Sequence, residues 1–225
     1  MINFLYLPLT IALFIAAKHL QQRLSVTWLN PVLITLTILV IALLALDIPF
    51  NDYNQYSGWL SKLLEPAVVA LGVPLYKQLY EIKRELPRIA ITILIAAGIA
   101  ISTTVAMALL VGATPEIAAS LAPKSVTTPI AVLISEQVAG EPALTAIAVL
   151  ITGLVGAVVG IPVLKLCGVH SSKAQGIAMG TACHALGTAR IAEEGHQHGA
   201  YGALALVLSA TFSALLCPLI VRLFV

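Results

Sequence analysis

Residues 123–129 read Pro-Lys-Ser-Val-Thr-Thr-Pro and place a cation and three hydroxyls between two prolines, inside the otherwise apolar stretch 115–138. Proline lacks a backbone donor and clashes with the preceding helical turn, so this segment predicts a broken helix. In hydrocarbon an unpaired backbone group is costly, and irregular backbone persists only inside protein or beside a water-filled cavity. If the stretch lies in a membrane, it therefore indicates a binding site.

The composition predicts a membrane protein. Of 225 residues, 60% are hydrophobic and 10% are charged, and the formal net charge is +2. A soluble domain carries roughly 25% charged residues, so the composition excludes a soluble enzyme and a DNA-binding protein. Three distant cysteines predict neither a disulfide framework nor a metal site. Since about 20 helical residues cross a bilayer, the chain has room for roughly seven to nine crossings.

Long uncharged stretches predict the simple spans. Four membrane helices are expected at 29–46, 89–111, 143–164 and 199–221. Residues 4–17 add a fifth helix, and because no basic residue precedes them, they predict a retained helix rather than a signal peptide.

Three further apolar stretches, 59–79, 115–138 and 174–195, are interrupted by proline or glycine. Both residue types force or permit irregular backbone. The predicted helix breaks are Pro66, Pro74, Pro123, Pro129 and Gly180.

A clean helix followed by a broken segment occurs twice. Pro123 follows Arg88, where one clean helix begins, by 35 residues, and Gly180 follows Ala143, where the next begins, by 37. Paired interrupted segments in two halves are typical of a transporter binding site. An inverted repeat is therefore predicted, although the two halves share no residue-level identity.

Charge bias distinguishes two topologies. If 115–138 is a re-entrant hairpin, eight Lys and Arg lie on one side of the membrane and one on the other, whereas a crossing gives six against three. The positive-inside rule favours the hairpin. For 174–195 both alternatives stay open.

The predicted fold is an all-α polytopic membrane protein with about six full transmembrane helices and two broken or re-entrant segments. Residues 1–225 are expected to form a single integral membrane domain. Within it, 1–58 supply two scaffold helices and 59–225 form the core, with the broken segments at 115–138 and 174–195.

The first candidate binding cluster lies between the two prolines. The free amides and positive dipole end of a broken helix suit a carboxylate. Hydroxyls would complete the coordination and a lysine would supply the counter-charge. Alternatively, the hydroxyls cap helix ends and the lysine reaches the membrane surface. The candidates are Lys124, Ser125, Thr127 and Thr128.

The second cluster lies in Gly180-Thr-Ala-Cys-His-Ala-Leu-Gly-Thr-Ala-Arg190, where the substrate-binding candidates are Thr181, His184, Gly187, Thr188 and Arg190. Ionisable residues in a membrane are functional candidates by default. His184 titrates near neutral pH and could bind an anion or pass a coupling proton. Alternatively, it is a neutral group tying two helices together, and Arg190 pairs with Glu193 or Glu194.

Glu65 is a second candidate for proton coupling, or a carboxylate that faces water at a helix end. The run 193–198 contains Glu and His but resembles a solvated connector, so no metal and no cofactor are predicted. The common motifs of hydrolases, zinc proteases and nucleotide-binding loops are absent from the sequence, and no enzyme is predicted.

Four segments resemble the LrgB/CidB family, and within it the YohK-type inner-membrane branch. They are Glu65–Tyr76, Pro115–Ser120, Pro123–Ala131 and Gly180–Arg190. The resemblance covers essentially the whole chain. Cys183 stands where the family pattern implies serine, and 136–141 replaces a smaller or glycine-rich loop.

The resemblance implies two kinds of function. Bacterial members are named as antiholin-like regulators of murein hydrolase activity that act with a small holin-like membrane protein. Plant members are plastid glycolate/glycerate translocators, and some bacterial systems are implicated in pyruvate uptake.

Together, the broken segments and the resemblance predict a multi-pass protein of the cytoplasmic (inner) membrane. Its predicted function is secondary transport of small monocarboxylates of the glycolate, glycerate, lactate or pyruvate type, with proton coupling as an option. The alternative is an antiholin-like regulator of a holin-like partner. Expected partners are the substrate, membrane lipid and that small protein, with no nucleic acid; homo-oligomerisation stays open.

Overall fold

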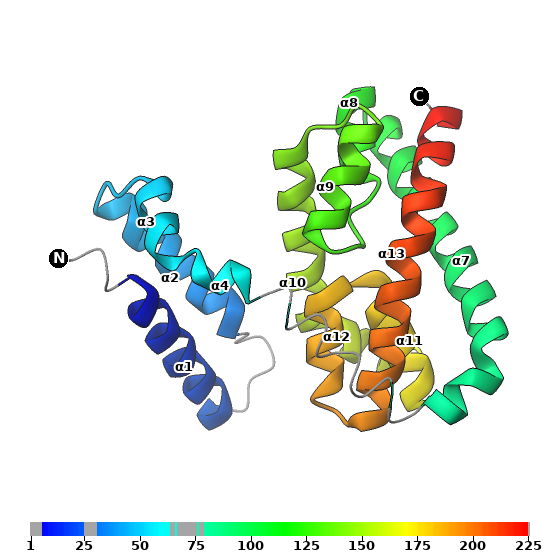
Figure 1. Ribbon diagram of the computed structural model, residues 1–225, viewed down its shortest axis with the longest axis horizontal. Coiled ribbons are helices and arrows are strands. Elements are labelled where there is room, and N and C mark those ends of the chain that lie inside the picture. The colour runs from blue at the N-terminus through cyan, green and yellow to red at the C-terminus, as the bar shows by residue number, and fades with distance from the viewer. Residues whose placement is uncertain (1–5, 25–30, 64–65, 67–75, 77–78, 225) are drawn as a thin grey trace. The chain divides into compact units, whose positions relative to one another are not determined.

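The computed structural model describes residues 6–24, 31–63, 66, 76 and 79–224. Every regular element in these ranges is a helix, which confirms the predicted all-helical class (Figure 1). The chain forms two compact units, Met1–Ala70 and Leu71–Val225. The predicted helix break Pro74 and the proton-coupling candidate Glu65 lie outside the described residues. Pro66, another predicted break, is described as a single position whose neighbours are not.

The first unit contains α1 (Tyr6–Leu24), α2 (Pro31–Ala45), α3 (Phe50–Ser57) and α4 (Trp59–Lys62). Aromatic and hydroxyl side chains join α1 to α3. The Tyr6 and Tyr53 rings lie 5.9 Å apart, and the hydroxyls of Thr10 and Tyr53 are 3.0 Å apart.

The second unit contains α7 (Leu79–Leu110), α8 (Pro115–Leu121), α9 (Thr128–Gln137), α10 (Pro142–Leu166), α11 (Ser172–Ala182), α12 (His184–Ala192) and α13 (His196–Phe224). Within the described residues, three segments are long and apolar enough to cross a membrane: Lys83–Leu110, Pro142–Leu166 and His196–Phe224. These correspond to three of the four uncharged spans that the sequence predicts, 89–111, 143–164 and 199–221. The fourth corresponds to α2, whose 15 described residues fall short of the length of a full span. The chain is a helical membrane protein; the predicted total of about six spans stays a prediction.

Each broken segment forms a pair of short helices. Helices α8 and α9 lie at one end of the second unit, where α7 ends and α10 begins, and α11 and α12 lie at the other end (Figure 1). Hydroxyls fasten the first pair to α10: the Ser120 hydroxyl accepts from the Glu141 amide at 2.7 Å, and the Thr145 hydroxyl lies 2.7 Å from that of Ser135.

The prolines of the first pair begin helices. Pro115 and Pro129 occupy the first turns of α8 and α9, where a missing amide hydrogen costs nothing. Pro123 lies in the connection between the two helices, as predicted for a break.

In the second pair the break comes three residues later than predicted, because Gly180 lies inside α11 and the chain turns at Cys183 and His184. Gly180 instead allows close helix packing, since a Cβ there would collide with the backbone of Gly202 on α13.

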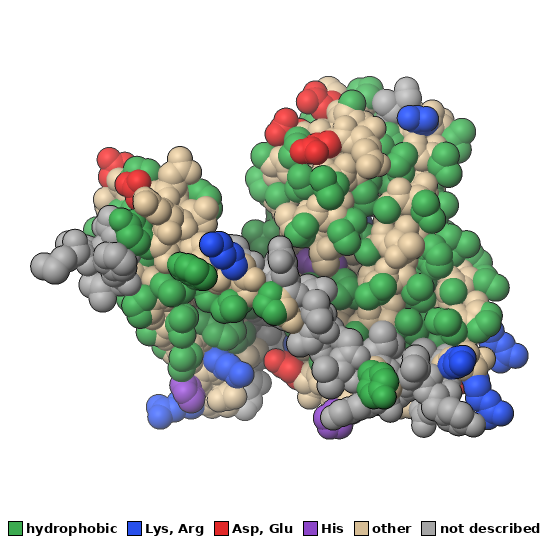
Figure 2. All heavy atoms as spheres, viewed as in Figure 1, with side chains coloured by type: hydrophobic (Ala, Val, Ile, Leu, Met, Phe, Trp, Pro, Cys, Tyr) green, Lys and Arg blue, Asp and Glu red, His purple; other side chains and the backbone are tan. Residues whose placement is uncertain are grey.

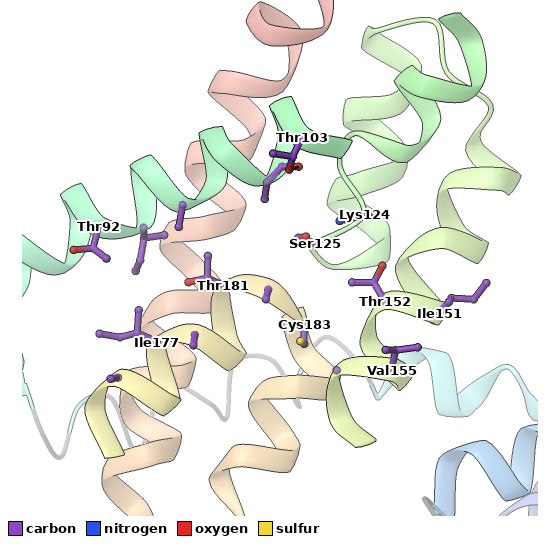
Figure 3. Close-up of a pocket in the computed structure, with 17 residues that line it drawn as sticks. Thr92, Thr103, Lys124, Ser125, Ile151, Thr152, Val155, Ile177, Thr181 and Cys183 are labelled. Atoms are coloured by element: carbon purple, nitrogen blue, oxygen red, sulfur yellow. Dashed lines mark hydrogen bonds between the residues drawn. The ribbon is translucent and has the colours of Figure 1, made fainter. Parts of the chain in front are cut away.

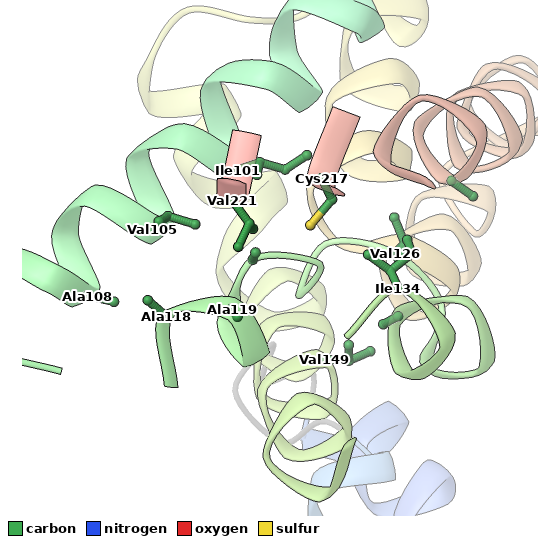
Figure 4. Packing of buried hydrophobic residues seen from close by; sticks show 13 residues of the cluster. Ile101, Val105, Ala108, Ala118, Ala119, Val126, Ile134, Val149, Cys217 and Val221 are labelled. Atoms are coloured by element: carbon green, nitrogen blue, oxygen red, sulfur yellow. The ribbon is translucent and has the colours of Figure 1, made fainter. Parts of the chain in front are cut away.

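A buried apolar cluster connects α7, the first helix pair, α10 and α13 (Figure 4). Val126, which is 1% exposed, projects into it from the connection between α8 and α9. The cluster also contains Ile101, Val105, Ala118, Val149, Cys217 and Val221. Anchoring Val126 in this core fixes the connection and thereby positions the residues beside it.

Candidate functional site

A cavity of about 910 Å³ lies between α7, the α8–α9 connection, α10 and α11. Both broken segments contribute to its wall. Figure 3 shows Lys124 and Ser125 from the first segment facing Thr181 and Cys183 from the second. Further hydroxyls on the wall come from Thr92, Thr103 and Thr152, and the rest of the lining is mostly apolar.

The connection between α8 and α9 presents Lys124 to the cavity by turning twice. The Lys124 amide donates to the Leu121 carbonyl at 3.2 Å, and the Val126 amide donates to the Pro123 carbonyl at 3.2 Å. Pro123 and Val126 are buried, whereas Lys124 and Ser125 are half-buried. The core thus holds two residues of this segment and leaves the polar pair between them on the cavity wall.

Lys124 has no counter-ion among the described residues. The ion pairs found there join Lys173 to Glu85, and Arg190 to Glu193 and Glu194. An ionisable group in the middle of a membrane helix bundle is costly unless it is paired. Lys124 therefore provides an uncompensated positive charge on the cavity wall, which an anionic ligand would stabilise.

Thr181 contributes an unsatisfied hydroxyl. The residue is 8% exposed, and its Oγ1 has no hydrogen-bond partner among the described residues. Buried polar atoms are nearly always paired, so an orphan on a cavity wall calls for a ligand or water. Thr181 and Lys124 thus present two unsatisfied polar groups to one cavity.

The second broken segment turns through a strained residue. His184, the first residue of α12, has a φ of 43°, a conformation that costs a non-glycine residue free energy. Its side chain is buried, and Nε2 lies 2.9 Å from the Val149 carbonyl of α10. Because a carbonyl only accepts, this contact assigns the proton to Nε2.

Glycines on α10 make room for this turn. A Cβ at Gly153 would meet the His184 ring, one at Gly156 would meet Cys183, and one at Gly160 would meet Met179. These three glycines therefore pack within the chain, against the second helix pair.

The structure brings together Lys124, Ser125 and Thr181 of the predicted binding residues. The others do not line this cavity. Thr127 and Thr128 begin α9, and Gly187 packs against Cys183.

Two further predicted binding residues have local partners. The Thr188 hydroxyl donates to the His184 carbonyl at 2.9 Å. Arg190 pairs with Glu193 at 3.3 Å and Glu194 at 3.0 Å, the alternative that the sequence had left open.

Sequence reasoning missed the contributions of the neighbouring helices. Thr92 and Thr103 come from α7 and Thr152 from α10. All three lie inside stretches that the sequence analysis predicted only as apolar membrane helices. A hydroxyl in a membrane helix usually bonds its own backbone, as Thr92 does to the Arg88 carbonyl at 2.9 Å. The sequence therefore carried no signal that separated these threonines from structural ones. Cys183 was noted only as a departure from the family pattern.

An ion pair lies next to the cavity where α11 begins. Lys173 Nζ lies 2.8 Å from Glu85 Oε1, and the Tyr201 hydroxyl donates to Glu85 Oε2 at 3.1 Å. The side chain of Lys173 is 38% exposed and that of Glu85 is 40% exposed. The hydrogen bond to the Glu85 carboxylate raises the pKa of Lys173 above its ordinary value. This contact joins α7, α11 and α13 at one end of the second unit.

Replacing the orphaned hydroxyl should stabilise the empty protein. Thr181→Val keeps the shape and removes a buried polar atom without a partner, whose desolvation costs about 1–3 kcal/mol. We expect a higher melting temperature in detergent, together with weaker binding of any anion. The matched control is Thr211→Val, because that exposed hydroxyl bonds only its own helix, to Val207 at 3.0 Å. A lower melting temperature for Thr181→Val alone would show that the hydroxyl has a structural partner.

Comparison with known proteins identifies the family of the chain but finds no similar solved structure. The model of the LrgB-like family matches residues 10–223. An uncharacterised protein of Haemophilus influenzae is 38% identical over 222 residues, covering 99% of this chain and 96% of its own length. The uncharacterised protein YwbG of Bacillus subtilis is 33% identical over 217 residues, 96% of each chain. The holin-like protein CidB of Staphylococcus aureus is 30% identical over 220 residues, 98% of this chain and 96% of its own. No solved structure is significantly similar to the chain.

Proposed function

The chain belongs to the LrgB-like family of membrane proteins, and we propose that it is a secondary transporter of small monocarboxylates. The substrates are of the glycolate, glycerate, lactate or pyruvate type. The observation that carries this proposal is the meeting of the two broken segments on one cavity, where, among the described residues, Lys124 has no counter-ion and Thr181 no hydrogen-bond partner.

In the proposed complex the carboxylate lies between the two broken segments. Lys124 supplies the positive charge, and the hydroxyls of Ser125 and Thr181 donate to the carboxylate oxygens. Charge-assisted hydrogen bonds of this kind are roughly twice as strong as neutral ones. Among the described residues, one cation and no carboxylate line the wall, which suits a monoanion.

The proposed topology is an inverted repeat. Helix α7 with the α8–α9 pair forms one half, and α10 with the α11–α12 pair forms the other, each pair being a re-entrant hairpin. In Figure 2, acidic side chains gather at the α8–α9 end of the second unit, where a basic side chain also lies near the C-terminus, and most of the Lys and Arg visible on this unit gather at the other end, with an acidic side chain nearby. By the positive-inside rule, the basic end faces the cytoplasm of a protein embedded in the inner membrane by several passes.

Proton coupling is proposed through His184. Its ring joins α12 to α10 through the Val149 carbonyl and lies next to Cys183 of the cavity wall. A change in its protonation would alter how the second helix pair packs on α10, and so link a proton to movement of the site. Glu65 is kept as a second candidate for this role.

A regulatory function is the second candidate. The observation that favours it is the name of CidB, a holin-like protein. In that case this chain would bind a small holin-like membrane protein and modulate murein hydrolase activity. The polar groups at the two broken segments would then serve assembly, and their substitution would disturb the complex rather than solute flux.

Uptake into proteoliposomes tests the proposal. We expect saturable uptake of labelled glycolate, lactate or pyruvate by the chain alone, faster with an inward proton gradient and lost in His184→Ala. Saturable pyruvate uptake that does not respond to the proton gradient would refute proton coupling and support transport. Absence of uptake by folded protein, both alone and with a small holin-like protein co-reconstituted, would favour the regulator.

A further inference from the structure

The cavity is larger than a two- or three-carbon acid requires. Its volume of about 910 Å³ lies toward the upper end of the roughly 300–1,000 Å³ typical of pockets for drug-sized ligands. Ala174 and Ala182 both line it, eight residues apart on α11, which is about 12 Å of helix axis. A carboxylate held at Lys124 therefore leaves most of this length unfilled.

The two ends of the cavity differ in chemistry. Figure 3 shows Lys124 and Ser125 at one end, and Ile177 at the other. From the charged end past Ile177, the facing walls of α7 and α11 carry mostly small or aliphatic side chains: Ile93, Ala96 and Ala100 on α7 and Ala174 and Ala178 on α11. The same walls also carry Thr181 and Thr92, and the Thr92 hydroxyl donates to its own helix, to the Arg88 carbonyl.

We propose that this apolar compartment binds the tail of the substrate, so that the site accepts monocarboxylates with an extended aliphatic or aromatic tail. The carboxylate stays at Lys124, Ser125 and Thr181, and the tail lies between α7 and α11. This inference rests on the proposed anion site. It extends the substrate class from short hydroxy and keto acids to acids with apolar tails.

Burial of the tail gives a quantitative expectation. Each methylene removed from water improves affinity about fourfold, if the wall contacts it fully. Butyrate and hexanoate should therefore compete with glycolate increasingly well, and acetate poorly. A site shaped only for short acids would show the opposite order, because a longer tail would collide with the wall.

Glycolate counterflow in proteoliposomes at equal pH on both sides is the appropriate assay, because weak acids that cross the bilayer would collapse a pH gradient. Acetate, butyrate, hexanoate and benzoate are added as competitors. We expect hexanoate and benzoate to inhibit at concentrations at least about tenfold lower than acetate, as several buried methylenes require. Equal inhibition by all four acids, or inhibition by acetate alone, overturns the inference.

Substitutions that fill the apolar compartment test whether the substrate tail binds there. Ala178→Leu, and separately Ala96→Leu from the facing wall, should weaken inhibition by hexanoate by at least about tenfold more than inhibition by acetate. Ala214→Leu, an exposed position of the same type on α13, should change neither ratio. If Ala178→Leu changes acetate and hexanoate equally, the tail does not lie between α7 and α11.

A binding measurement separates this inference from the proposed function. The melting temperature in lipid nanodiscs should rise more with hexanoate than with acetate, and Lys124→Met should abolish both shifts. Counterflow of glycolate without any advantage for longer acids refutes the apolar compartment and leaves the carrier intact. Hexanoate stabilisation without counterflow refutes transport and leaves the compartment intact. If neither glycolate counterflow nor stabilisation by hexanoate is observed, both the carrier and the apolar compartment are refuted.

Discussion

Lys124→Met should lower glycolate uptake about a hundredfold while raising the melting temperature of the empty protein. Loss of one partner of a buried charge pair costs about 2–5 kcal/mol of binding, and an anion bound at this cation would lose that amount. Without ligand, however, Lys124 is a half-buried charge with no counter-ion among the described residues. Methionine replaces it with an apolar side chain of similar length and removes the desolvation cost.

The two readouts, uptake in proteoliposomes and melting in detergent, move in opposite directions only if Lys124 is a binding residue. Lys165→Met is the matched control, because Lys165 is exposed in the last turn of α10 and does not line the cavity. It should leave both readouts within error. Unchanged uptake in Lys124→Met at full expression would remove the lysine from the site, and with it the central argument for a carboxylate carrier.

Gly156→Ala should destabilise the protein, and Gly98→Ala should not. A Cβ at Gly156 would collide with the Sγ of Cys183 and lie 2.5 Å from its Cβ, whereas one at Gly98 would meet only Leu216 Cδ1 at 3.9 Å. Overpacking of this kind typically costs about 1–3 kcal/mol. In a helix interior without such a clash, alanine instead gains up to about 1 kcal/mol over glycine.

The comparison uses the same chemical change in two membrane helices, so differences in the lipid or detergent cancel. Melting temperatures should fall for Gly156→Ala and stay level or rise for Gly98→Ala. Uptake should fall with the former, because Cys183 and its neighbours on the cavity wall would be displaced from α10. Equal melting temperatures for the two variants would show that the second helix pair does not pack on α10 as the structure has it.

Much of the architecture was predictable because its causes are local. The low charge content identifies a membrane protein from composition alone, and long apolar stretches predicted α7, α10 and α13. The prolines predicted a break in 115–138, and the structure has two short helices there, α8 and α9, each with a proline in its first turn, a preference that depends only on the adjacent backbone.

The sequence predicted the break in the second segment at Gly180, three residues too early, for a physical reason. Glycine permits a break but equally permits close packing of helices, and nothing next to Gly180 in the sequence distinguishes the two. The packing of α11 on α13 decides it, because only there does the Gly202 backbone come so close that Gly180 can carry no side chain. The turn instead falls at His184, whose φ of 43° no residue preference would have predicted.

Composition and residue pattern alone predicted a helical membrane protein with two polar, interrupted segments, and they included Lys124, Ser125 and Thr181 among the candidate binding residues. Composition and residue preference act over a few neighbouring positions, so they define helices and breaks without knowledge of the fold. Only the tertiary structure decided that the two segments, more than fifty residues apart, meet on one cavity. Only packing leaves Lys124 without a counter-ion and Thr181 without a partner in the part of the chain that the structure describes, while His184 and Arg190 have partners nearby. Whether a polar group is satisfied depends on atoms brought close by folding, and that proximity is not encoded at any single position of the chain.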